Sequence, residues 1–201
     1  MELYTYLHKR VLITSKSRYE ASRRLRMHSL CSQWTLAFMA VGQIVLSLIA
    51  VFELNAPVIS VNLQNSVGLF FAIVVLTYSL LLGMGDFSAR ASNIHQCGLE
   101  LSELARELNY KVVKKESSSE EKYMKYVQRF YTCLSRHENH ITHDYLIAKL
   151  DVAQENDNKL GFFKKWFSFK AKIYFFRVIG FLHYPVSILS IIAWISYLLI
   201  K

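Results

Sequence analysis

Apolar positions are concentrated in long runs without charge, and charged residues fill the chain between them. The charge-free runs cover residues 27–52, 54–85 and 178–200. A membrane-spanning helix needs about 20 mostly apolar residues to cross about 30 Å of hydrocarbon. Two segments of 19 residues, 34–52 and 67–85, and the 23 residues of 178–200 meet this requirement. We therefore predict an all-α membrane protein with a transmembrane helical hairpin at residues 34–85 and a third, C-terminal transmembrane helix within residues 178–201.

A second interpretation treats these runs as buried helices of a soluble core, although soluble helices rarely contain charge-free runs of such length. For residues 178–200 it stays open whether the helix crosses the bilayer or lies against the hairpin. The preceding residues 161–177 combine aromatic with basic side chains. This composition is typical of segments at the membrane interface.

Basic residues lie on one side of the predicted hairpin. Residues 1–33 carry seven Lys or Arg against two acids, whereas the loop 53–66 carries one acid and no base. Because short cytoplasmic flanks of membrane helices are enriched in Lys and Arg, we expect the N-terminus and residues 86–177 to be cytoplasmic. The chain has 24 Lys plus Arg, 15 Asp plus Glu and a net charge of +9. This excess is mostly a topology signal, and no nucleic-acid-binding motif accompanies it.

The polar segments have helical periodicity. Residues 87–115 place apolar or small side chains at steps of three and four, which defines one helix face. Ser119 is the expected N-cap of a second helix that continues to about residue 155, with one face running from Tyr123 to Tyr145. We expect these helices to form a cytoplasmic hairpin within residues 86–160, with a basic helix in residues 1–33 packed on it.

Polar and small residues share faces of the predicted spans. They are Gln43, Ser47 and Ala50 in the first span and Gly68, Ala72, Ser79 and Gly83 in the second. Such faces either pack helices together or line a pore in an oligomer. Gln43 is the most informative, because an amide at membrane depth must find a partner or water. The third span has its own polar stripe at His183, Ser187 and Ser190, with His183 near the interface.

Two further groups are candidates for chemistry. His137, His140 and His143 recur at steps of three beside Asp144, which suits either a polar helix face or a metal site, and Cys133 precedes His137 by four residues. The spacing differs from the H-E-x-x-H zinc motif. The three cysteines share no close spacing, so reduced thiols are expected. The basic run contains Arg18, Arg23, Arg24 and Arg26. It contacts either anionic lipids or an anionic regulator.

The segment SRYEASRRL at residues 17–25, directly before the first span, resembles the start of SLATT domains. These are the SMODS- and SLOG-associating two-transmembrane effectors of bacterial conflict and anti-phage systems. The order of a basic helix, two spans with a short outer loop and a helical region supports the resemblance. It implies a bacterial inner-membrane protein that oligomerises and breaches the membrane when an operon-encoded partner senses phage. Such partners include nucleotide cyclases, nucleotide-sensing proteins and reverse transcriptases.

Neither the residues nor the resemblance supplies a catalytic or cofactor motif; a phosphate-binding G-x-x-x-x-G-K-[ST] loop, for example, does not occur. We therefore expect a non-enzymatic homo-oligomer that permeabilises the inner membrane, so that the cell dies or stops growing, as in abortive infection. The alternative is a non-conducting membrane anchor or scaffold that docks a cytoplasmic partner through the helices of residues 87–155.

Overall fold

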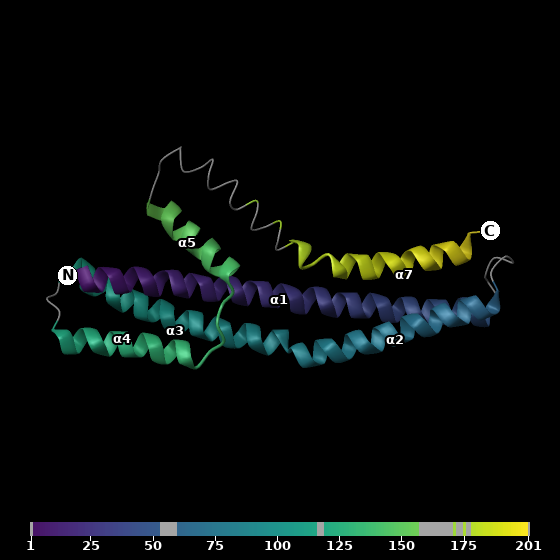
Figure 1. The fold of residues 1–201 in the computed structure, drawn as a ribbon, viewed down its shortest axis with the longest axis horizontal. Coiled ribbons are helices and arrows are strands. Elements are labelled where there is room, and N and C mark those ends of the chain that lie inside the picture. Colours follow the sequence, from purple (N-terminus) through teal and green to yellow (C-terminus); the bar gives the residue numbers. More distant parts are fainter. Residues whose placement is uncertain are drawn as a thin grey trace. The chain divides into compact units, whose positions relative to one another are not determined.

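The described part of the chain is built from α-helices. The computed structural model describes residues 2–52, 60–115, 119–156, 171, 175 and 178–200. Its helices are α1 (Glu2–Val51), α2 (Val61–Gly85), α3 (Phe87–Val113), α4 (Glu120–Ser135), α5 (Thr142–Asn156) and α7 (His183–Leu199) (Figure 1). These elements confirm the all-α prediction. The expected interfacial segment 161–177 lies outside the described residues, except for Ala171 and Phe175.

The chain divides into two compact units. The polar unit contains Met1–Arg26 and Ser88–Phe175, and the apolar unit contains Met27–Phe87 and Phe176–Lys201. Helix α1 contributes to both, because it continues for 50 residues. The charge pattern predicts a basic helix in residues 1–33 and a separate span from residue 34, whereas α1 is continuous across this boundary. No Pro or Gly interrupts residues 2–41, so nothing in the local sequence ends the helix there.

The core of the polar unit lies between the first half of α1, α3 and α4. Its buried members are Tyr4, Leu7, Val11, Cys97, Leu101, Leu104, Ala105, Leu108, Phe130 and Cys133. The predicted apolar face of residues 87–115 is therefore confirmed as the buried face of α3, and α1 packs on it. Two serines on α1 also form hydrogen bonds with backbone carbonyls of α3. Ser15 Oγ donates to the Gly98 carbonyl at 2.9 Å, and Ser22 Oγ donates to the Ala91 carbonyl at 2.8 Å.

The single helix expected from Ser119 to residue 155 is wrong, because the structure contains two helices there. Ser119 is the N-cap of α4 as predicted, with its hydroxyl accepting from the Lys122 N–H at 3.4 Å. Helix α4 then ends at Ser135 and α5 begins at Thr142. The connector 136–141 is held by α1, since Arg18 donates to the Glu138 carbonyl and to the side chain of Asn139. Residues of the connector do not form helix hydrogen bonds, so their backbone groups need other partners. Arg18 is such a partner for the Glu138 carbonyl.

The apolar unit packs the second half of α1 against α2 and α7. Its buried core consists of Met39, Leu46, Ile49, Phe71, Ile191 and Leu198. At Gly42 the side chain of Ile191 is so close that an added Cβ would lie 2.5 Å from its Cδ1. The absence of a side chain at Gly42 therefore sets the distance between α1 and α7.

Most of α2 turns apolar side chains outward. Leu69, Phe70, Ile73, Leu76, Leu80 and Leu81 are all more than half exposed. An apolar surface of this extent is stable in lipid rather than water. By length and composition, two helical stretches are able to cross a membrane, namely α1 and the stretch Val61–Val113 that contains α2. Helix α7 is shorter, with 17 residues and a length of about 26 Å. It begins at His183, and Pro185 occupies its first turn, where proline is tolerated.

Candidate functional site

A largely apolar groove that also contains amide and hydroxyl groups lies between α1 and α2 within the apolar unit. It has a volume of about 450 Å³, and its lining is Gln43, Leu46, Ser47, Ala50, Val51, Gln64, Asn65, Gly68, Leu69 and Ala72. The structure thus brings together Gln43, Ser47 and Ala50 with Gly68 and Ala72, which the sequence analysis placed on separate helix faces. The small residues leave room for the groove, and the amides supply its polarity.

Two amide atoms in this groove lack hydrogen-bond partners among the described residues. They are Gln43 Oε1 and Gln64 Nε2, and both atoms are buried. A buried polar atom without a partner costs about 1–3 kcal/mol. Ser47 is satisfied locally, because its hydroxyl donates to the Gln43 carbonyl at 3.0 Å. Gln64 was missed from the sequence, although its spacing of four from Gly68 places it on the same helix face.

The remaining predicted pore or interface residues lie outside the groove. Ser79 and Gly83 are exposed on α2. Among the described residues, no atom from outside the local helix backbone lies within 4 Å of a Cβ placed on Gly68 or Gly83, so there is space beside α2 at these two positions. The stripe on α7 does not line the groove either. Within α7, Ser187 Oγ and Ser190 Oγ donate to the carbonyls of His183 and Ser187, each at 2.8 Å.

The four arginines of the basic run occupy two different environments. Arg18 is almost fully buried and is used to hold the connector 136–141. Arg24 pairs with the buried carboxylate of Asp144. Arg23 and Arg26 are exposed instead. They line a pocket of about 460 Å³ together with Lys16, Tyr19, Glu20, Ser22, His95 and Asp151. This placement differs from the expectation that all four side chains contact lipids or a regulator.

The three histidines around residue 140 do not gather into a metal-ligand cluster within the described residues. His140 stacks on Tyr145, with ring centroids 5.8 Å apart. Its pKa is lowered by burial and by the positive charge of Arg18, although Asp144 opposes this effect. Because the connector interrupts the helix, the expected common face of His137, His140 and His143 does not form.

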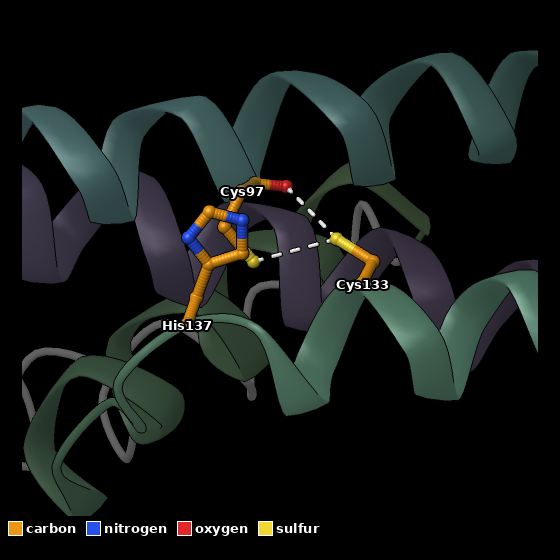
Figure 2. Close-up of side chains that lie close together, drawn as sticks. All are labelled: Cys97, Cys133 and His137. Atoms are coloured by element: carbon orange, nitrogen blue, oxygen red, sulfur yellow. Dashed lines mark hydrogen bonds between the residues drawn. The ribbon is translucent and has the colours of Figure 1, made fainter.

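His137 instead lies beside two cysteines from different helices. Cys97 of α3, Cys133 of α4 and His137 place one potential ligand atom each within 4.8 Å of one another (Figure 2). The two sulfurs are 3.6 Å apart. Burial raises the pKa of both thiols. Cys133 and His137 stand at helical spacing in the sequence, but no local pattern links Cys97 to them, because it is 36 residues away from Cys133.

The comparisons with known proteins agree with the helical membrane architecture. A family model for SMODS and SLOG-associating 2TM effector domain family 5 matches residues 2–196, which is nearly the whole chain. Neither a curated protein nor a solved structure matches it. The match includes α1, α2 and α7 as well as the helices of the polar unit. The chain therefore belongs to the SMODS and SLOG-associating 2TM effector domains, family 5, the SLATT group of membrane effectors in conflict systems.

Proposed function

We propose that this protein assembles into a homo-oligomer in the bacterial inner membrane and permeabilises it when a partner or a nucleotide signal triggers the assembly. The groove between α1 and α2 carries the proposal, because two residues that line it, Gln43 and Gln64, have buried amide atoms without partners among the described residues. Gln43 lies in the middle of the charge-free run, where an amide without a partner is costly in hydrocarbon. Water in a conducting path or a side chain of another copy would satisfy Gln43 and Gln64.

The open face of α2 supports assembly. Gly68 and Gly83 have free space where a side chain would be, and small residues let membrane helices approach closely. In the assembly, the amides of Gln43 and Gln64 and the hydroxyl of Ser47 face the permeating ion. Such groups replace part of its hydration shell.

The polar unit is the proposed receiver of the signal, on the cytoplasmic side of the membrane. Its pocket beside Arg23 and Arg26 also contains Lys16 and His95, and basic side chains suit a phosphate-bearing regulator or a lipid headgroup. Helix α1 lines this pocket and also carries Gln43. A ligand or partner that alters the packing of α1 in the polar unit thus acts on the helix that lines the groove.

Release of dye from liposomes containing the purified protein tests the pore. We expect release to change in Gln43→Leu and Gln64→Leu. Gln33→Leu is the matched control, because Gln33 is an exposed glutamine on the same α1 helix and lies outside the groove. Release that is equal in all variants would remove the groove from the path. If lysate from phage-infected cells carrying the complete system also fails to cause release, the pore itself is excluded.

A scaffold that docks a partner is the second candidate function. Leu99 on α3 and Met124 on α4 are apolar and about half exposed, which favours a protein contact on these helices. A scaffold would lose partner recruitment in Leu99→Ser or Met124→Ser and would tolerate Gln43→Leu. Loss of toxicity in Gln43→Leu with recruitment unchanged would favour the pore instead.

A further inference from the structure

We propose that the polar unit binds a zinc ion through Cys97 Sγ, Cys133 Sγ and a ring nitrogen of His137. Figure 2 shows the three side chains pointing toward one another. Their potential ligand atoms all lie within 4.8 Å of one another. Two thiolates and an imidazole are a common ligand set of zinc in proteins.

The separation of the sulfurs fits a shared ion better than a covalent bond. Zinc–sulfur bonds of about 2.3 Å in a tetrahedral site place two sulfur ligands roughly 3.8 Å apart. The Cys97 and Cys133 sulfurs are 3.6 Å apart. A disulfide would require about 2.05 Å. Little movement of either side chain is therefore needed to admit the ion.

The surrounding fold holds the three ligands on a rigid frame. Cys97 and Cys133 belong to the buried core between α3 and α4. His137 lies two residues after the last residue of α4, Ser135, and its N–H donates to the Leu134 carbonyl at 3.4 Å. Arg18 binds the next two residues of the connector, Glu138 and Asn139. Arg18 is thus a positioning residue for the imidazole.

Charge and access also suit an ion at this place. Binding would release the two thiol protons to solvent, and the two thiolates would then neutralise the double charge of the ion without any change of oxidation state. Burial first, and then Cys97 and the neighbouring Glu100 carboxylate, raise the pKa of the Cys133 thiol, and Cys133 Sγ also donates to the Cys97 carbonyl at 3.9 Å. Glu100 and Cys133 line one groove, which gives water a route to the fourth coordination position. The ion would cross-link α3, α4 and the connector.

Cobalt substitution tests the site in the full-length protein in detergent. Metal-free protein is titrated with Co²⁺ under reducing conditions, and sulfur-to-cobalt charge-transfer absorption reports thiolate ligation. We expect stoichiometric uptake, displacement by Zn²⁺ and a higher melting temperature with Zn²⁺. Cys97→Ser, Cys133→Ser and His137→Gln should each weaken binding by about tenfold or more, as even outer-shell changes at metal sites do.

Two control variants make the same kinds of substitution outside the proposed zinc site. Cys31→Ser changes the third cysteine, which lies in the apolar unit, and His143→Gln changes a histidine outside the cluster. Both should bind Co²⁺ as the unchanged protein does. If a cysteine variant unfolds, His137→Gln decides, because its partly exposed side chain is not part of the hydrophobic core. The proposal is overturned if the charge-transfer band is absent or if it persists in His137→Gln and both cysteine variants.

Discussion

Arg24 of α1 and Asp144 of α5 form a two-point ion pair inside the polar unit. Arg24 Nε and Nη2 donate to the two carboxylate oxygens of Asp144 at 3.2 and 3.1 Å. The Asp144 side chain is only 2% exposed. Together with the buried side chains of Ile147, Ala148 and Val152, this pair fastens α5. Arg24 is therefore an internal anchor rather than a free contact for phosphate.

Removing one partner of this pair should be strongly destabilising. We expect Arg24→Ala to lower the free energy of unfolding by about 3–5 kcal/mol, because Asp144 is left buried without a counter-charge. The double variant Arg24→Ala/Asp144→Leu should recover much of this loss. Chemical denaturation followed by circular dichroism measures both.

The pair between Arg129 and Glu107 is a matched control for that measurement. It is also a two-point pair, in which Arg129 Nη1 and Nη2 donate to the two Glu107 carboxylate oxygens at 2.7 and 3.0 Å, but its side chains are 54% and 38% exposed. Solvent weakens exposed pairs, so Arg129→Ala should cost less than about 1 kcal/mol. If Arg24→Ala and Arg129→Ala lowered the free energy of unfolding equally, burial would not account for the strength of the Arg24–Asp144 pair.

Gly42 offers a test of how α7 packs on α1. A Cβ there would overlap Ile191, so Gly42→Leu should destabilise the apolar unit by about 1–3 kcal/mol. Gly42→Leu/Ile191→Ala should recover part of this loss, because it removes the Ile191 side-chain atoms that a Cβ at position 42 would overlap. Thermal unfolding in detergent gives the comparison. Gly68→Ala is the control, because open space surrounds that position and alanine improves helix propensity. A stable Gly42→Leu would contradict the close contact.

Asp86 separates α2 from α3 by a single left-handed residue, with φ 37° and ψ 44°. Asn and Gly adopt this conformation more readily than β-branched residues. We expect Asp86→Asn and Asp86→Gly to keep the thermal stability of the protein, whereas Asp86→Val should lose about 1–2 kcal/mol. A more stable Asp86→Val would mean that α2 and α3 prefer one continuous helix.

His140 makes the stability of the polar unit dependent on pH. Its pKa lies below the ordinary 6.5 in the folded protein, because of burial and Arg18, with Asp144 opposing. The unfolded chain therefore binds a proton more readily as the pH falls through 6.5, and the folded state loses stability there. Above pH 6.5, His140 is neutral in both the folded and the unfolded chain, and its titration no longer lowers the stability of the folded state. Denaturation at several pH values should show that the free energy of unfolding falls less at acid pH in His140→Gln than in the unchanged protein. An unchanged pH profile would contradict a role of His140 in this pH dependence.

Local patterns predicted the elements better than the contacts between distant residues. The face of α3 from Ala91 to Leu108 was predictable, since steps of three and four define it alone. The break between α4 and α5 was not, because it depends on Arg18, which is 120 residues from Glu138 in the sequence. Gln64 was missed for a different reason: the predicted second span begins at residue 67, three residues after Gln64, although its spacing of four from Gly68 places it on the same helix face.

The unpartnered amides of Gln43 and Gln64 have a consequence for the abundance of the protein. If another copy supplies their missing hydrogen bonds, encounters in the plane of the membrane rise with the square of surface density. Association then follows mass action, and the assembled fraction rises steeply over a narrow range of protein-to-lipid ratio. A cell that makes little of this protein would keep it as separate chains, and a modest rise in expression would cross the threshold without any change in the chain itself.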